Sequence, residues 1–319
     1  MSDGRGAELG RRLAARDLTA APEALNLLES SAPAHEADRK AILAAVSPKA
    51  LGAEPAGHVV GITGPPGAGK STLIGALVKE LRGSGRTVAV IAVDPSSKRS
   101  GGSLLGDRAR IEFDPADGDL LIRSMAAGER LGGLARPTRD AAAALSAAFD
   151  VVVVETVGVG QSETEIAEVA DTVCVVVQPA SGDTLQFIKS GIMEIPHVLV
   201  VTKADLGQIA QRARRDLHAA LRSLGAKDTS VVAVSSVPPP SGFESLVDAI
   251  DAHFESLDVE SERAQRRRAQ ALAEFAEEHG RRGMSALGGR RNAVKQLDSL
   301  PAELDVPGMV TELASRAGL

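Results

Sequence analysis

Aromatic residues and cysteine are scarce in this chain. Its 319 residues include no Trp, no Tyr, six Phe and one Cys. So few aromatic side chains offer no stacking platform for single-stranded nucleic acid. The single cysteine, Cys174, excludes an intramolecular disulfide and a CxxC metal site, and it fits a reducing, cytoplasmic compartment. No apolar run reaches the roughly 18 residues of a membrane-spanning helix, and the N-terminus is not typical of a secretory signal, so we expect no membrane partner.

Positive charge is also in deficit. The chain has 36 Lys and Arg residues against 42 Asp and Glu residues, which gives a formal net charge of −6. That balance argues against a broad nucleic-acid surface, and we expect no nucleic-acid partner. The six histidines are scattered, so they do not form a His-rich metal-binding tract.

One glycine-rich stretch is the strongest chemical signal in the sequence. The phosphate-binding pattern G-x-x-x-x-G-K-[ST] is matched at every fixed position by Gly64-Pro65-Pro66-Gly67-Ala68-Gly69-Lys70-Ser71-Thr72. A β-branched run precedes it and an apolar-periodic helix follows it, which is the context that the motif requires. The glycines let main-chain N–H groups wrap a phosphate chain at a helix N-terminus. We expect Lys70 to reach the β- and γ-phosphates and Ser71 to bind Mg²⁺.

The segment from His58 to about Phe254 alternates strand and helix patterns. Continuous apolar runs are typical of parallel strands buried on both faces, and helical periodicity separates them. We therefore predict an α/β fold, a doubly wound and mostly parallel sheet. Ligands of such sheets bind beyond the carboxyl ends of the strands. The expected strands are 58–63, 87–93, 120–123, 151–155, 172–178, 198–202 and 231–235.

Helical segments flank this α/β region. We expect a helical N-terminal extension at 1–56, a P-loop domain at 57–256 and a helical C-terminal arm at 257–319. The charged stretch 260–279 predicts an exposed helix, with the run Arg266-Arg267-Arg268 on its solvated face. The arm is a candidate dimerisation or partner surface.

A short motif after the sixth expected strand indicates which base is bound. Thr202-Lys203-Ala204-Asp205 is similar to the guanine signature N-K-x-D, with Thr in place of Asn. A carboxylate at 205 would accept hydrogen bonds from guanine N1–H and N2–H₂, a donor pair that adenine lacks, while the stem of Lys203 lies along the base. After the seventh strand, Ser235-Ser236-Val237 is expected to form the base-rim loop, which commonly reads S-A-K. We therefore predict GTP or GDP as the ligand.

Carboxylates at three positions are expected around one Mg²⁺. Glu155 closes the fourth strand, where NTPases place the acid that holds the metal, and Gly158 follows where an N–H meets the γ-phosphate. Asp94 ends the second strand, which we expect beside the P-loop strand, and it can reach the metal or orient the attacking water. Asp107 follows a glycine-rich segment and can move to the metal as part of a switch. No glutamine directly follows Gly158, so we predict slow hydrolysis that a partner raises.

The chain resembles the MeaB/ArgK-type P-loop GTPases over roughly residues 57–255. The stretches that carry the resemblance are Ala92–Ser97, Gly101–Asp107, Val154–Glu163 and Ser181–Gly191. The resemblance implies a SIMIBI-type G domain, GTP hydrolysis and a homodimer. It also implies a chaperone that gates cofactor loading and protects adenosylcobalamin-dependent methylmalonyl-CoA mutase. The last stretch is similar to the third switch of the family, in which Lys189 is our candidate for partner-stimulated catalysis.

The chain departs from the family pattern in three places. Thr202 replaces the Asn of the base motif, which should weaken guanine binding modestly. In the third switch, Phe187 stands for Gly and Ser190 for the second Lys of L-Q-G-I-K-K-G. The tail after about residue 260 lacks the tryptophan-bearing segment of the family's dimerisation arm. We therefore expect the partner to be methylmalonyl-CoA mutase or a relative that acts on another acyl-CoA.

Two other functions fit a P-loop fold. A nickel metallochaperone GTPase would use His-rich or Cys/His clusters, which this sequence lacks. A small-molecule kinase would need an acceptor pocket and lid arginines, and the arginines between Arg108 and Arg139 keep that alternative open.

Overall fold

The chain folds as two compact units in the computed structural model. One unit contains residues 1–57, 143–148 and 258–319, and the other contains 58–142 and 149–257. The structure describes residues 4–94 (of Asp94, the backbone alone), 114, 116–126, 134–156, 166–179, 196–223, 225–226 and 228–319. The predicted site residues Asp107, Gly158 and Lys189 lie outside these ranges, as do Phe187, Ser190 and most of the expected switch segments.

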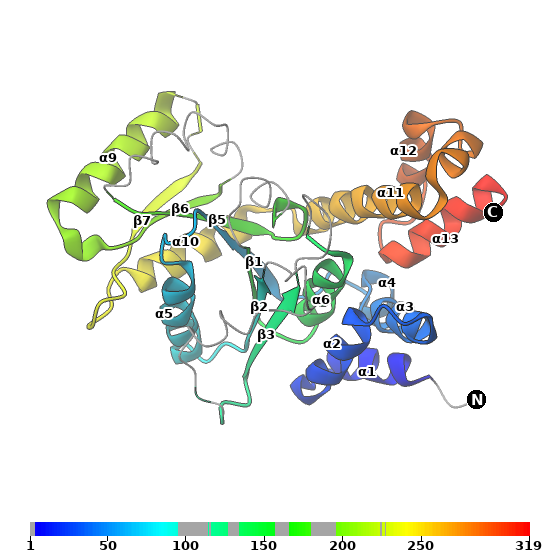
Figure 1. Cartoon of the computed structure of the whole chain (residues 1–319), viewed down its shortest axis with the longest axis horizontal. Coiled ribbons are helices and arrows are strands. Elements are labelled where there is room, and N and C mark those ends of the chain that lie inside the picture. The colour runs from blue at the N-terminus through cyan, green and yellow to red at the C-terminus, as the bar shows by residue number, and fades with distance from the viewer. Residues whose placement is uncertain are drawn as a thin grey trace, which may run out of the picture. The chain divides into compact units, whose positions relative to one another are not determined.

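A seven-stranded sheet with parallel neighbours forms the centre of the second unit (Figure 1). Its order is β3-β2-β4-β1-β5-β6-β7. The prediction of a doubly wound, mostly parallel sheet is confirmed, and each expected strand forms within a few residues of its predicted ends. The strands are β1 (His58–Thr63), β2 (Val88–Asp94), β3 (Leu120–Ala126), β4 (Val151–Glu155), β5 (Thr172–Val177), β6 (Val198–Val201) and β7 (Ser230–Ala233).

The strand order corrects one expectation from the sequence. The second strand does not lie beside the P-loop strand, because β2 pairs with β3 and β4. β4 is inserted between β2 and β1, so Glu155 lies opposite Ile62 of β1 and Ala92 of β2. The order of strands along the chain does not determine their order in the sheet, since a crossover can return the chain to either side. Glu155 therefore ends the strand adjacent to β1, and Asp94 ends the next strand out.

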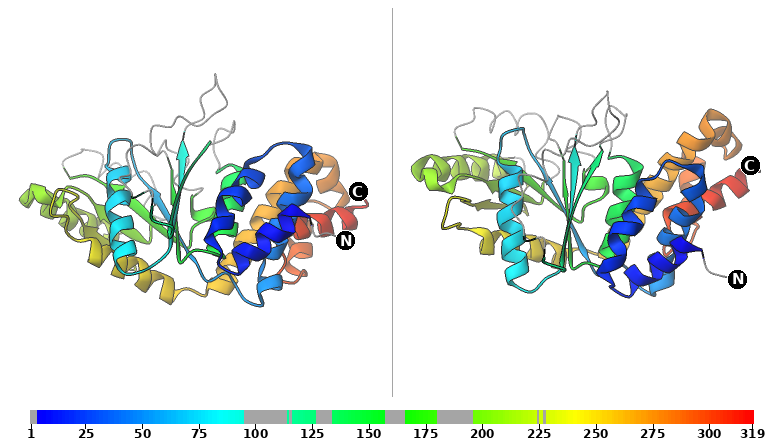
Figure 2. Two further views of the ribbon diagram at one scale, coloured as in Figure 1. Left: turned by 90° about the horizontal axis from the view of Figure 1, so that it is seen from below. Right: turned by 60° about the horizontal axis from the view of Figure 1, so that its bottom comes forward.

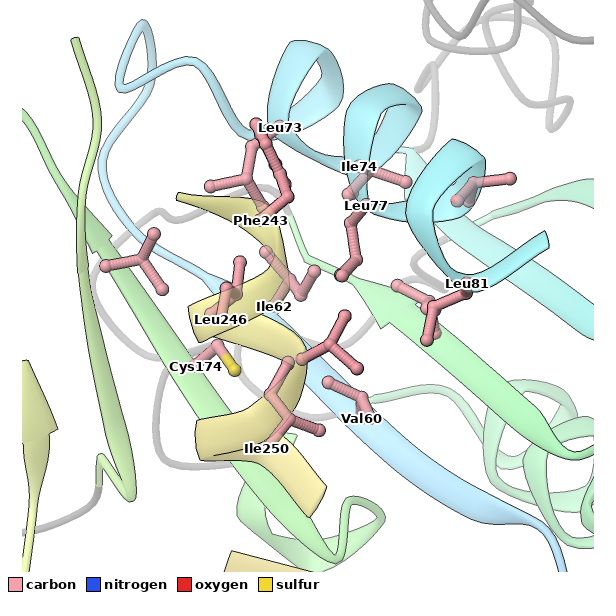
Figure 3. Close-up of a cluster of buried hydrophobic side chains, with 14 of the residues drawn as sticks. Val60, Ile62, Leu73, Ile74, Leu77, Leu81, Cys174, Phe243, Leu246 and Ile250 are labelled. Atoms are coloured by element: carbon pink, nitrogen blue, oxygen red, sulfur yellow. The ribbon is translucent and has the colours of Figure 1, made fainter. Parts of the chain in front are cut away.

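Helices α5 (Lys70–Gly83) and α10 (Phe243–Ser256) pack on one face of the sheet. Figure 3 shows their apolar side chains meeting those of β1, with Leu73 and Leu77 from α5 and Leu246 and Ile250 from α10. Each such side chain contributes about 1.5–3 kcal/mol when it is removed from water, so this contact fixes the start of α5 against β1. Figure 2 shows α5 standing along the face of the sheet.

Helix α9 (Gln208–Ser223) contacts β6 and β7. Val198 and Val200 of β6 belong to the core beneath α10. The alternate residues, Leu199 and Val201, are also buried and point to the other face of the sheet. Figure 1 shows α9 and α10 on opposite sides of β6 and β7. Among the described residues of the sheet region there is one further α-helix, α6 (Arg136–Ser146), which contributes residues to both units.

The other unit combines helices from both ends of the chain. The N-terminal helix α3 (Glu36–Ala45) contacts the C-terminal helix α13 (Val306–Ala317), and the N–H of Lys49 donates to the carbonyl of Glu303. The C-terminal helices share an apolar cluster that includes Leu272, Phe275 and Leu313. Within the ranges described above, no helix combines the length and apolar character needed to cross a lipid bilayer. The helices are α1 (Arg5–Ala14), α2 (Ala21–Glu29), α3 (Glu36–Ala45), α4 (Pro48–Leu51), α11 (Val259–Ala286), α12 (Arg290–Asp298) and α13 (Val306–Ala317).

The arginine run of α11 is not a solvated face, contrary to the expectation from the sequence. The guanidinium of Arg267 donates to both carboxylate oxygens of Glu54, at 2.9 and 2.7 Å, and to the carbonyl of Ala302 at 2.8 Å. Its side chain is 16% exposed. A bidentate pair of this kind has a defined geometry, so Arg267 attaches α11 to the segment that precedes β1.

Candidate nucleotide-binding site

The predicted site residues that the structure describes gather at one edge of the sheet. The strands are parallel, so their carboxyl ends all lie at this edge. The P-loop follows β1, Glu155 ends β4, the motif with Lys203 and Asp205 follows β6, and Ser235 follows β7. The topology therefore brings residues that are far apart in the sequence to one place, as in other open α/β sheets.

The loop from Gly64 to Gly69 turns the chain from β1 directly into α5. At Gly64, a Cβ atom would lie 2.4 Å from the carbonyl oxygen of Val176, so a larger residue does not fit. Gly69 precedes the helix with a φ of 91°, a left-handed conformation that favours glycine. The helix begins at Lys70, and the N–H groups at the N-terminus of a helix attract an anion. In the loop, Ala68 is buried and Pro65 is half-buried, whereas Pro66 and Gly67 are exposed. Thr72, in the first turn of α5, is exposed as well.

The side chain of Lys70 is held within this loop. Its Nζ donates to the carbonyl oxygens of Gly64 at 2.8 Å and Pro65 at 3.3 Å. The residue is 8% exposed. The ammonium group is thereby fixed beside the main-chain donors that would cradle a phosphate, where its charge attracts an anion.

Ser71 and Glu155 form the candidate magnesium site. The Ser71 hydroxyl donates to Oε1 of Glu155 across 3.1 Å, and Glu155 is 5% exposed. Hydroxyl and carboxylate oxygens are the hard ligands that Mg²⁺ prefers, so this donor set fits the metal. A divalent cation here would also offset the cost of burying the carboxylate. The backbone of Asp94 ends β2 two positions beyond Ala92, the partner of Glu155 in the sheet.

Two threonines fix the exit of β4 beside the start of the P-loop. The Thr156 hydroxyl donates to the Thr63 hydroxyl at 3.0 Å, and the Thr156 N–H donates to the carbonyl of Ile62 at 3.1 Å. Both threonines are fully buried. These bonds hold Thr156, the residue after Glu155, against the end of β1.

Thr202 connects the base-binding loop to the P-loop. Its hydroxyl lies 3.0 Å from the carbonyl oxygen of Ala68 and 3.3 Å from that of Val177, and it donates to these acceptors. The residue is buried. The threonine that replaces the usual asparagine thus makes a direct contact with the phosphate-binding loop.

Lys203 makes a second connection through a residue that the sequence did not single out. Its Nζ donates to Oε1 of Gln178 at 2.6 Å, and Nε2 of Gln178 donates to the carbonyl of Gly67 at 3.1 Å. Lys203 has a φ of 55°, so the chain turns sharply where β6 ends. The sequence could have pointed to Gln178 by its position, because it is the first polar residue after the apolar run of β5 and therefore lies at the carboxyl end of the sheet.

Asp205 and Ser235 come together as the predicted base subsite requires. The Ser235 hydroxyl donates to Oδ1 of Asp205 at 2.8 Å and accepts from the N–H of Val237 at 3.2 Å. Asp205 is solvent-exposed, so its carboxylate can accept hydrogen bonds from a ligand. Ser236 is half-buried, whereas Val237 is 56% exposed at the rim.

Comparisons with known proteins agree with this geometry. A family model described as "Methylmalonyl Co-A mutase-associated GTPase MeaB" matches residues 21–284. A "Putative GTPase" of Pyrococcus horikoshii is 48% identical over 199 residues, which cover 62% of this chain and 60% of that protein. The mitochondrial methylmalonic aciduria type A homolog of Mus musculus is 45% identical over 157 residues, which cover 49% of this chain and 38% of that protein.

A solved structure extends the likeness to the fold. The crystal structure of a "LAO/AO transport system kinase" has a TM-score of 0.67 to this chain and is 29% identical in sequence. The match covers 93% of this chain and 98% of that one. The likeness therefore includes the helices outside the sheet as well as the sheet.

Proposed function

We propose the following function for this chain, which belongs to the family of methylmalonyl-CoA mutase-associated GTPases called MeaB. The proposed activity is the hydrolysis of GTP to GDP and phosphate, slowly alone and faster with a partner. The proposed partner is an adenosylcobalamin-dependent acyl-CoA mutase, methylmalonyl-CoA mutase or a close relative. The chain would gate cofactor loading of that enzyme and protect it.

The convergence of the P-loop with Asp205 and Ser235 is the single observation that most supports a guanine nucleotide. One end of the site offers main-chain N–H groups and Lys70 for the phosphates. The other end offers the exposed carboxylate of Asp205, oriented by a hydrogen bond from Ser235. In our proposal this carboxylate accepts from guanine N1–H and N2–H₂, which adenine does not present.

Ser71 and Glu155 would hold Mg²⁺, and Asp94 and Asp107 are proposed to complete its coordination shell. When bound, the metal neutralises charge on the β- and γ-phosphate oxygens. Lys70 leaves the carbonyls of Gly64 and Pro65, or shares its protons with them, to donate to the same phosphates. Lys189 is proposed as the residue through which a partner stimulates hydrolysis.

The resemblance to the family also predicts a homodimer and a cytoplasmic location, and both stay predictions. The C-terminal helices α11 to α13 are the proposed dimerisation segment. They have an apolar cluster of their own, so they can present a defined surface.

Cofactor transfer tests the proposed function. Adenosylcobalamin is delivered to the apo-mutase in the presence of this chain with GTP, with a non-hydrolysable GTP analogue, or with GDP, and mutase turnover is followed. We expect loading to depend on which nucleotide is present. A loading rate that is the same in all three conditions, and the same without the chain, contradicts the gating role. Transfer of the γ-phosphate to a metabolite instead of water would support a kinase, as the structural neighbour is titled.

A further inference from the structure

A groove follows the outer edge of β7, the last strand in the order of the described sheet. One hollow of about 490 Å³ is lined by α9, by β7 and by α10. A second hollow of about 700 Å³ shares His218 and Thr229 with it and extends along the end of α9. We call the two together the β7 groove. Figure 1 shows α9 and α10 on the two sides of this strand.

The main chain is open toward this groove at the start of β7. Farther along, Gly242 packs against the carbonyl of Ala233 and Ser235 pairs with Ser241. The N–H groups of Ser230 and Val234 donate inward, to the carbonyls of His197 and Val201. Main-chain groups alternate in direction along a strand, so those of Thr229 and Val231 point outward. Both residues line the groove, and no described strand pairs with β7 on that side. An edge of this kind is a template for another strand.

The two walls of the β7 groove differ in charge. The α9 wall carries Arg214, Arg215 and Arg222, all exposed, whereas the α10 wall carries Ser245 and Ala249. The described residues that line the groove include no Asp or Glu. This positive wall stands out in a chain with a net charge of −6.

The pKa of His218 also reflects the positive charge of the α9 wall. Its pKa is lowered, first by burial and then by the positive charges of Arg214 and Arg222. A negative ligand on this wall would oppose the effect of the arginines and favour the protonated imidazole.

We propose that the β7 groove binds an extended, acidic segment of a partner protein, which adds to the sheet as a further strand. The main chain of that segment pairs with Thr229 and Val231. Its side chains alternate between the two walls, because successive residues of a strand face opposite sides. Carboxylates on one side meet the α9 arginines, and small side chains on the other side meet Ser245 and Ala249.

The charge of the groove argues against two other occupants. A second copy of this chain that paired through its own β7 in antiparallel fashion would bring its α9 arginines to the same face, where like charges repel. A nucleic acid would use the arginines but not the strand edge, and the described lining residues include no Phe, Tyr or Trp for base stacking.

In the sequence, the groove residues of β7 directly precede residues of the nucleotide site. β7 continues into Val234, whose carbonyl accepts from the N–H of Ala204, and then into Ser235, which holds Asp205. A strand docked on β7 therefore contacts the element that leads directly to the base subsite.

The test uses the full chain and a fluorescent peptide of about eight residues that alternates Val and Glu, the length of an ordinary strand. We expect the fluorescence anisotropy of the peptide to rise and reach saturation as the chain is added. We expect Arg214→Glu combined with Arg215→Glu to weaken binding about tenfold or more. The matched control is Arg212→Glu, an exposed arginine of the same helix that lies outside the groove lining and should leave binding unchanged.

Backbone pairing is tested separately from charge. Two peptides of the same sequence are compared, one N-methylated at every Val and the other at every Glu. One of the two should lose binding, since it cannot form the strand hydrogen bonds along the edge that faces β7. Val231→Pro should do the same by removing an outward N–H. Absence of saturable binding, equal weakening by the Arg212→Glu control, or unchanged binding of both N-methylated peptides overturns the proposal. Displacement of the peptide by a single-stranded oligonucleotide, which then binds more tightly, also overturns it.

Discussion

The hydroxyl of Thr202 donates to the carbonyl oxygen of Ala68 across 3.0 Å, which joins the base-binding loop to the phosphate-binding loop. Both residues are buried, at 5% and 0% exposure. The guanine signature has asparagine where this chain has Thr202. The substitution therefore removes an amide from the motif but retains a connection between the two halves of the site.

Removing that connection should weaken nucleotide binding. Thr202→Val keeps the shape of the side chain but leaves the Ala68 carbonyl without this donor. A hydrogen bond of this kind contributes about 0.5–1.5 kcal/mol, so we expect GDP affinity to fall about 2- to 10-fold by titration calorimetry. Thr202→Ser retains the hydroxyl and is the matched control. Equal affinities of the valine and serine variants would show that the bond has no role in binding.

Asp205 should determine the preference for guanine. Asp205→Asn replaces an acceptor oxygen with an amide that can donate, so hydrogen bonds to guanine N1–H and N2–H₂ are weakened or lost. We expect the preference for GTP over ATP to fall on the order of 100-fold in competition binding, since bonds to charged groups contribute about 1.5–3 kcal/mol each. Ser235→Ala, which removes only the orienting hydroxyl, should have a smaller effect in the same direction. An unchanged preference in Asp205→Asn refutes the assignment of the base subsite.

Most of the fold followed from the sequence because its signals are local. The apolar runs were long enough and the turn residues clear enough to locate all seven strands. The P-loop motif specified its own context, and the structure has β1 before it and α5 after it. The placement of Asp205 and Ser235 near each other followed from topology, since both leave parallel strands at the same edge.

The errors concern contacts between distant residues. The insertion of β4 between β1 and β2 depends on the path of a crossover, which strand patterns do not encode. The pairing of Arg267 with Glu54 joins residues from opposite ends of the chain, and a run of charges looks the same whether solvated or paired. Gln178 was missed for a similar reason, because its role depends on Lys203 and Gly67.

The carboxylate of Glu155 should control the metal dependence of nucleotide binding. Glu155→Gln keeps the volume but removes the charge that attracts Mg²⁺. We expect the Mg²⁺ concentration that supports GTP binding to rise about tenfold or more. Glu80→Gln, an exposed position on α5, is the control and should leave the titration unchanged. If chelation of Mg²⁺ weakens GTP binding equally in wild type and in Glu155→Gln, the binding of Mg²⁺ does not depend on this carboxylate.

Cys174 should be inert in the folded protein, and its contribution to stability should change with pH only at high pH. It is buried in the core beneath α10, and burial raises the pKa of its thiol from 9.0 to about 12. The unfolded chain loses this proton first as the pH rises, so the stabilising contribution is complete below pH 9 and is lost between pH 9 and about 12. We expect the difference in free energy of unfolding between wild type and Cys174→Ala to narrow over that range in urea titrations. Rapid labelling of the native thiol by a disulfide reagent at neutral pH would contradict this account.

The rate of GTP hydrolysis, measured with and without an adenosylcobalamin-dependent acyl-CoA mutase, tests whether this chain is a GTPase that such a mutase stimulates. We expect a slow rate for the chain alone, a higher rate when the mutase is added, and no hydrolysis by Lys70→Ala in either condition. Lys79→Ala, at an exposed position on the same helix, should behave as wild type. A rate that no such mutase changes, or a Lys70→Ala variant that still hydrolyses GTP, would contradict this expectation.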